Sequence, residues 1–167
     1  MFGDHVDTDG ITPGKYENLP FPQLCNHCLE PLDPSFASGV ASGDIIVAGE
    51  NFGCGSAREI APRALKELGI GAVIAKSFAR TFFRNAVAIG LPLLVSREAA
   101  AACQPKDVLS VDIARALLRN VTSNAAIGAE PVPPGLYRIL AKGGLFAALR
   151  KGTGPKTGRT RRPKGRS

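Results

Sequence analysis

The 167-residue sequence has no long apolar run and no basic-then-apolar leader at its start. A membrane-spanning helix needs about 18 or more consecutive apolar residues, so we expect no membrane span. The opening MFGDHVDTDG is acidic and glycine-rich, unlike a secretory signal. We therefore expect a cytoplasmic protein without disulfides. Apolar residues make up 44% and charged residues 21% of the chain, which fits one globular domain and disfavours a disordered chain or a fibre.

The C-terminal residues 150–167 lack acidic side chains but carry eight basic ones. The whole chain has a net charge of +7, yet residues 1–149 contain 13 basic and 14 acidic residues. The basicity therefore belongs to the terminus, which also has no apolar residue to bury. We predict a folded domain over 1–149 and a disordered basic tail over 150–167. The tail is interpreted as a solubilising terminus; contact with nucleic acid or an acidic partner is the alternative.

The four cysteines lack the second ligand pair that a structural zinc site usually requires. Cys25 and Cys28 form a CxxC, but prolines surround it where a redox motif would have a strand and a helix. We interpret the thiols as buried or incidental, with metal binding or redox chemistry as alternatives.

Short apolar runs predict buried strands over 44–48, which is bounded by Gly43 and Gly49, over 71–76 and over 91–95. Helical periodicity predicts helices over 57–68 and over 77–89, the latter capped by Ser77. Strand, helix, strand, helix, strand at this spacing predicts a parallel sheet.

The flanking segments carry weaker signals. Residues 1–44 are rich in proline, glycine and aspartate, so we expect turns, a short strand or two and a helical turn around 24–29. After Ser96 we expect a short alanine-rich helix, antiparallel strands near 108–112 and 115–121, and a closing helix over 145–150.

A glycine-rich turn follows the first predicted strand, in the sequence GENFGCGSAREIAPR (49–63). Glycine lets a backbone adopt positive φ and approach a ligand closely. A helix start offers unpaired N–H groups to an anion, and Arg58 could grip a carboxylate with both guanidinium nitrogens. Arg58 stands where a dinucleotide-binding turn has its third glycine, which disfavours a dinucleotide-binding protein. A Gly-Lys-Ser/Thr phosphate loop is also absent from the sequence.

Ser56 has two interpretations. With Glu59 it forms the S-x-x-E pattern of a helix capping box. Alternatively, its hydroxyl faces a ligand held by Arg58 and by backbone amides, which would also stabilise an alkoxide.

Two further clusters of polar residues could bind a ligand. Residues 3–11 contain three aspartates and a histidine, which suit a metal, although aspartate-rich turns have the same composition; we favour a turn that organises the site. Arg80 and Arg84 share a helix face near a strand end, where α/β proteins place ligands. A solvated basic face is the simpler interpretation.

Four segments resemble the small subunit of the aconitase-type hydro-lyases, the family that includes 3-isopropylmalate dehydratase. They are residues 3–16 (GDHVDTDGITPGKY), 27–37 (HCLEPLDPSFA), 43–59 (GDIIVAGENFGCGSARE) and 71–94 (GAVIAKSFARTFFRNAVAIGLPLL). With a weaker match over 135–149, the resemblance runs in family order through nearly all of residues 3–149.

The resemblance implies an α/β fold, a swivelling β/β/α three-layer domain with a parallel βαβαβ core and additional antiparallel strands. It implies a large partner subunit that holds a [4Fe–4S] cluster, so that this chain binds no cofactor or metal itself. Ser56 matches the family's catalytic base and Arg58 a substrate-binding arginine. Gly55, Ala57 and Asp9 are the other expected substrate-binding residues. The implied activity is that of a hydro-lyase, active only with its partner, as in the isopropylmalate isomerisation of leucine biosynthesis.

Some positions depart from the family pattern and leave the substrate open. Ala57 stands where many relatives have serine, and Ile60 where many have histidine or glutamine. Residues 17–22 lack the usual threonine-bearing sequence of isopropylmalate enzymes. The alternative is a related hydro-lyase that acts on another small hydroxy-acid, such as a dimethylmalate, a methyl-substituted malate, maleate or homoaconitate.

Overall fold

The computed structural model describes residues 1–150, so the predicted basic tail lies, beyond Arg150, outside the described residues. The division into domain and tail stays a prediction. None of the helices in residues 1–150 has the length and apolarity that a bilayer crossing requires. The helices and strands are α1 (Thr8–Ile11), α2 (Phe21–Cys25), α3 (Phe36–Gly39), β1 (Ile45–Ala48), α4 (Ile60–Glu67), β2 (Ala72–Ala75), α5 (Arg80–Ile89), β3 (Leu93–Val95), α6 (Ala99–Ala102), β4 (Leu109–Asp112), β5 (Leu117–Asn120), β6 (Ala125–Ile127), α7 (Pro134–Ala141) and α8 (Leu145–Arg150).

A three-stranded parallel sheet with the order β1-β2-β3 forms the centre of the molecule. Ile45 lies opposite Ala72, and Val73 opposite Leu93. The three strands and the helices between them confirm the predicted βαβαβ core. The strands are apolar throughout because both faces of the sheet are covered.

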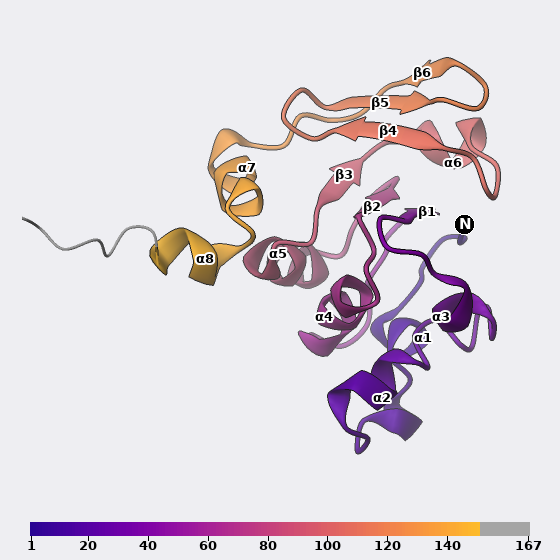
Figure 1. Cartoon of the computed structure of the whole chain (residues 1–167), viewed down its shortest axis with the longest axis vertical. Helices are drawn as coiled ribbons and strands as arrows, with labels where there is room; N and C mark the ends of the chain where they lie inside the picture. The colour runs from indigo at the N-terminus through magenta and orange to yellow at the C-terminus, as the bar shows by residue number, and fades with distance from the viewer. Residues whose placement is uncertain (151–167) are drawn as a thin grey trace, which may run out of the picture.

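The two faces of this sheet belong to different hydrophobic clusters, which gives the three layers seen in Figure 1. On one face, Val73 and Leu93 pack with residues of α4 and α5. On the other, Ile74 packs with Leu118 and Ile127 from the antiparallel sheet β4-β5-β6. The β/β/α arrangement that the resemblance implied is therefore confirmed.

Helix α4 begins at Ile60 rather than at 57, so of the two interpretations of Ser56 the capping box is wrong. Glu59 is the N-cap and makes no side-chain capping bond. Ser56 and Arg58 belong to the preceding loop. Pro62 then falls in the first helical turn, where its missing N–H needs no partner.

Other boundaries also differ from the predictions. Ser77 does not cap α5, whose N-cap is Ala79. The Ser77 hydroxyl instead accepts a hydrogen bond from the backbone N–H of Asn51, at 2.8 Å. The expected strands of residues 1–44 do not form, since the described structure has only helical turns and an isolated bridge from Asp7 to Cys54 there. The predicted helical turn near 24–29 is α2, which lies slightly earlier.

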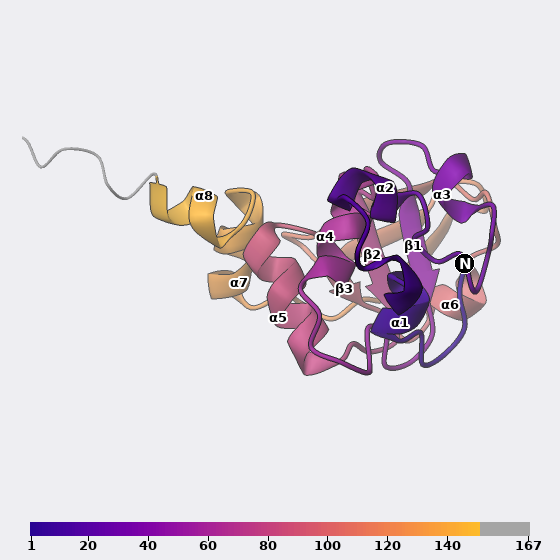
Figure 2. The same cartoon turned by 90° about the horizontal axis from the view of Figure 1, so that it is seen from below.

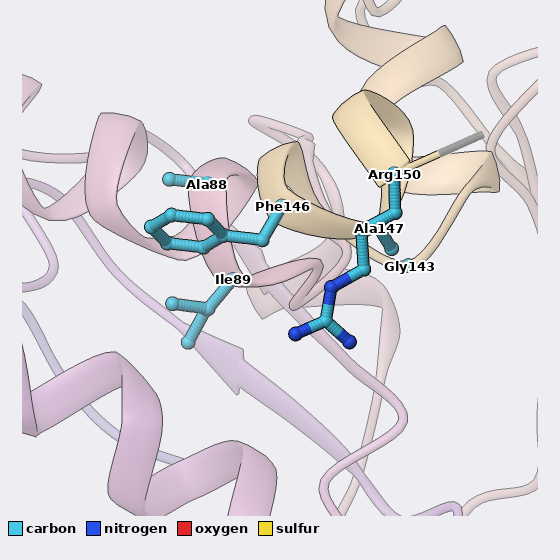
Figure 3. A pocket seen from close by; sticks show the side chains of 6 residues that line it. All are labelled: Ala88, Ile89, Gly143, Phe146, Ala147 and Arg150. Atoms are coloured by element: carbon cyan, nitrogen blue, oxygen red, sulfur yellow. The ribbon is translucent and has the colours of Figure 1, made fainter. Parts of the chain in front are cut away.

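The C-terminal part contains the predicted strands β4 and β5 and the predicted helix α8, but β6 and α7 were missed. Helices α7 and α8 lie beside α5, at the opposite end of the molecule from α1 (Figure 2). Gly90 and Gly144 allow this packing: a Cβ on Gly90 would lie 2.4 Å from the carbonyl carbon of Gly143. Figure 3 shows Phe146 of α8 beside Ala88 and Ile89 of α5.

Candidate active site

The candidate site is built where the loop after β1 meets the first residues of the chain. Residues 2–8 run alongside residues 47–54 and exchange backbone hydrogen bonds with them. The N–H of Phe2 donates to the Val47 carbonyl (2.9 Å), and the N–H of Thr8 donates to the Cys54 carbonyl (2.8 Å). The N–H of Gly53 returns a bond to Val6, at 2.7 Å. The site therefore lies at the carboxyl end of a parallel strand, where α/β folds place ligands.

Two glycines of this loop are required by close packing. A Cβ on Gly49 would lie 1.8 Å from Oδ1 of Asp4. Gly53 has φ +78°, and its Cβ would lie 2.2 Å from Cγ of Phe82. The loop is thus packed between the N-terminal segment and α5. At Gly49 and Gly53 the backbone closely approaches protein atoms, whereas the prediction was for a close approach to a ligand.

Ser56 is exposed at the turn that follows Gly55, which has φ +87°. Its hydroxyl lies 3.2 Å from the hydroxyl of Thr8. Gly55 and Ala57 flank it and are exposed as well. Within residues 1–150, the backbone N–H groups of residues 55–57 have no protein acceptor. A hydroxyl and three amides without a protein acceptor therefore lie in one exposed turn, and such donors can bind an anion or stabilise an oxyanion.

Arg58 lies beside this turn and is paired with Asp9. Its Nη1 is 2.7 Å from Oδ1 of Asp9 and 3.4 Å from the carbonyl of Thr12. Asp9 belongs to α1, whose N-cap Asp7 accepts a bond from the N–H of Gly10. The structure thus brings together all five predicted site residues: Asp9, Gly55, Ser56, Ala57 and Arg58.

The aspartates of residues 3–11 act as organisers of turns, as predicted. Asp4 Oδ1 accepts the N–H of Glu50 at 2.7 Å, Asp7 caps α1, and Asp9 orients Arg58. In the described part of the chain, no three His, Cys, Asp or Glu side chains are grouped as metal ligands. The hydrogen bonds of Asp4 and Asp7 support the turn interpretation for these two aspartates.

A polar cluster around Glu30 was missed by the sequence analysis. The Glu30 carboxylate accepts hydrogen bonds from Lys15 Nζ (3.0 Å) and the Tyr16 hydroxyl (2.8 Å), and contacts His27 Nδ1 at 2.6 Å. The bonds from Lys15, then Tyr16 and His27, lower the pKa of Glu30 to about 2. Tyr16 also stacks on His27, with ring centroids 3.7 Å apart. This cluster fixes the segment that follows Gly14. Gly14 itself packs against the Asp9–Arg58 pair.

The CxxC cysteines are buried between α2 and α4. Cys25 and Cys28 pack in one hydrophobic cluster with Leu24 and Ala64. Burial raises the pKa of Cys28 to about 12, and burial also raises the pKa of Cys25. Metal binding and disulfide exchange both use the thiolate, which burial disfavours here. The interpretation of these two residues as buried thiols is confirmed.

Arg80 and Arg84 line a pocket to which none of residues 55–58 contributes. This pocket of about 440 Å³ is also lined by Phe78 and Phe83, at the start of α5. Both arginines are exposed, in agreement with a solvated basic face.

Comparisons with known proteins match this geometry to one family. The model of the aconitase C-terminal domain matches residues 33–100. The chain is 48% identical to the 3-isopropylmalate dehydratase small subunit of Caldanaerobacter subterraneus subsp. tengcongensis, over 90% of this chain and 94% of that protein. It is also 48% identical to the small subunit of Moorella thermoacetica, over 87% of this chain and 88% of that protein.

The chain belongs to the family of 3-isopropylmalate dehydratase small subunits.

A crystal structure of 3-isopropylmalate dehydratase from Methanocaldococcus jannaschii shares the fold, with a TM-score of 0.84 and 43% identity over 90% of each chain. Membership of this aconitase-type family makes the chain the small subunit of a hydro-lyase, as the resemblance implied. The alignment with the Caldanaerobacter protein covers 90% of this chain and so extends well beyond the residues that match the domain model.

Proposed function

We propose that this chain is the small subunit of a 3-isopropylmalate dehydratase in which Ser56 acts as the base and Arg58 binds a substrate carboxylate. The observation that carries the proposal is an exposed turn in which Ser56 lies among backbone amides that have no protein acceptor, two residues before an arginine that Asp9 holds in place. Gly55 and Ala57 would bind substrate through their N–H groups, and Asp9 would act by orienting Arg58.

The cysteines of this chain do not fit an iron–sulfur cluster. Cys25 and Cys28 are buried in one hydrophobic cluster, whereas Cys103 is buried in another, next to the antiparallel sheet. Cys54 lies in the glycine loop with its thiol near the His5 carbonyl, and no three His, Cys, Asp or Glu side chains of residues 1–150 are grouped as metal ligands, so no three thiolates of this part of the chain converge on one site. We propose that the [4Fe–4S] cluster belongs to a large partner subunit, where it would supply a Lewis acid for the substrate hydroxyl. A cytoplasmic location stays a prediction.

The chemistry assigned to this chain is proton transfer and charge stabilisation. The carbon next to a carboxylate is a weak acid, so its proton needs a strong base. A serine oxygen acts as a strong base only when hydrogen-bond donors stabilise its alkoxide. The amides of residues 55–57, which have no protein acceptor, are the donors next to Ser56. Ser56, as an alkoxide, would take the carbon-bound proton while the hydroxyl of the adjacent carbon leaves as hydroxide, which would take a proton from an acid of the partner subunit or from solvent to become water. Return of water to the other carbon of the unsaturated acid would then give the isomer.

The test is reconstitution with a cluster-bearing large subunit, followed by measurement of hydro-lyase turnover. We expect the small subunit alone to be inactive. Ser56→Ala should lower kcat by at least about 100-fold, the usual contribution of a positioned base, without preventing co-elution of the two subunits. Ser38→Ala, at an exposed serine of α3, is the matched control and should leave kcat unchanged. Near-full turnover by assembled Ser56→Ala would overturn the assignment.

The substrate is tested in the same preparation. We expect 3-isopropylmalate to be preferred over dimethylmalate, methyl-substituted malates, maleate and homoaconitate. Preference for one of the others would leave the hydro-lyase assignment intact but would change the proposed substrate. Residues 17–22 would then be the first candidates for the residues that select it.

A further inference from the structure

The hydroxyl of Thr8 is buried directly beneath Ser56. Only 2% of Thr8 is exposed, and its Oγ1 lies 3.1 Å from the Ser56 carbonyl and 3.2 Å from the Ser56 hydroxyl. We propose that Thr8 is a positioning residue that holds the Ser56 hydroxyl and stabilises it when it is ionised. This inference rests on the proposed role of Ser56 as the base.

Thr8 is itself held firmly, as a positioning residue must be. Its N–H donates to the Cys54 carbonyl at 2.8 Å, and its own carbonyl accepts bonds from the N–H and the hydroxyl of Thr12, at 2.9 and 3.1 Å. A Cβ on Gly55 would lie 3.4 Å from Thr8 Oγ1, so the turn closes tightly over the threonine. The Thr8 oxygen thus has one fixed place relative to Ser56.

The proton count defines what Thr8 can do. A hydroxyl has one proton to donate and can accept hydrogen bonds as well. When the Thr8 proton points to the Ser56 carbonyl, the neutral Ser56 hydroxyl donates its proton to Thr8 Oγ1. The lone pairs of the Ser56 oxygen then face the exposed side. When Ser56 is an alkoxide, the Thr8 proton can turn to Ser56 Oγ without leaving Thr8. One threonine can thus serve both states of the base.

Two substitutions of Thr8 separate the effect of its hydroxyl from the effect of its side-chain shape. Thr8→Val keeps the shape but removes the hydroxyl, whereas Thr8→Ser keeps the hydroxyl. In the reconstituted enzyme, Thr8→Val should lower kcat by about 10- to 100-fold, the effect of losing a hydrogen bond to a charged group. KM should change by less than about threefold, because substrate binding is not altered. The acid limb of the kcat profile should move to higher pH, and Thr8→Ser should recover most of kcat.

The matched control is Ser96→Ala, which also removes a buried hydroxyl. Ser96 is 1% exposed and bonds Gly128 and Ala99; its loss should leave kcat and the pH profile of the assembled enzyme unchanged. If Thr8→Val does not assemble, Thr8→Ala provides the second hydroxyl-free variant for the same measurements.

The outcomes distinguish this inference from the proposed function. An inactive wild-type pair, or an active Ser56→Ala pair, would overturn the function itself. If wild type is active and Ser56→Ala is not, full kcat in the assembled hydroxyl-free variant would overturn only the role of Thr8. A loss of kcat that Thr8→Ser does not recover, or that occurs with an unchanged pH profile, would reduce Thr8 to a packing residue.

Discussion

Nη1 of Arg58 lies 2.7 Å from Oδ1 of Asp9, and the two side chains come from distant parts of the sequence. Arg58 is 30% exposed and Asp9 59% exposed, so the pair contributes little to stability, about 1 kcal/mol or less. Its effect is to fix the direction of the guanidinium. Arg58 is thereby oriented before any substrate carboxylate arrives.

Arg58→Lys should weaken substrate binding. A lysine ammonium does not reproduce the planar fork that grips a carboxylate, so we expect KM to rise by at least about tenfold. Steady-state kinetics of the reconstituted enzyme measure this. Asp9→Asn is the companion variant, and it should raise KM less because the guanidinium remains. An unchanged KM in Arg58→Lys would remove Arg58 from the binding site.

Gly53→Ala should destabilise the fold strongly. The residue has φ +78°, and the added Cβ would lie 2.2 Å from the Phe82 ring. Backbone strain and overpacking together are expected to cost about 3 kcal/mol or more of unfolding free energy. Urea denaturation measures the loss.

The control for that experiment is Gly39→Ala, because nothing lies within 4 Å of a Cβ at Gly39. Gly39 ends helix α3, so alanine should change the unfolding free energy by less than about 1 kcal/mol. Equal stability of the two variants would contradict the packing described for the loop.

Glu30 should stabilise the protein in a pH-dependent manner. Its pKa falls from 4.5 to about 2 in the folded protein, because Lys15, Tyr16 and His27 bond the carboxylate. The folded state thus keeps the charge to lower pH than the unfolded chain does. The stabilisation is complete above pH 4.5 and is lost as the pH falls toward 2.

Glu30→Gln removes that titration. Urea midpoints of wild type and variant should differ most above pH 4.5 and should converge as the pH falls toward 2. A difference that stayed constant over this range would show that the carboxylate is not held ionised by its three neighbours.

The core was predictable because its signals are local. The runs DIIVA, GAVIAK and LPLLV are short and apolar, which is how buried parallel strands look in a sequence. The start of α4 was misplaced because the S-x-x-E pattern at Ser56 imitates a capping box. Helix α7 begins at Pro134, directly after Pro133, and was missed although proline is common at a helix start.

The site was predictable only in part. The glycine turn and the resemblance together identified Ser56 and Arg58, since these lie in one continuous motif. Thr8 and Glu30 were not identified, because their importance depends on contacts between segments that only the folded chain brings together. A single sequence carries no local signal for such pairs.

Thr8 and Asp9 reach Ser56 and Arg58 because residues 2–8 are joined to residues 47–54 by backbone hydrogen bonds, outside the parallel sheet. Fraying of the N-terminus would therefore dismantle the constellation while the sheet and its helices stayed assembled. We therefore expect the reconstituted enzyme to lose activity on heating before the parallel sheet unfolds, because the constellation depends on the N-terminal segment.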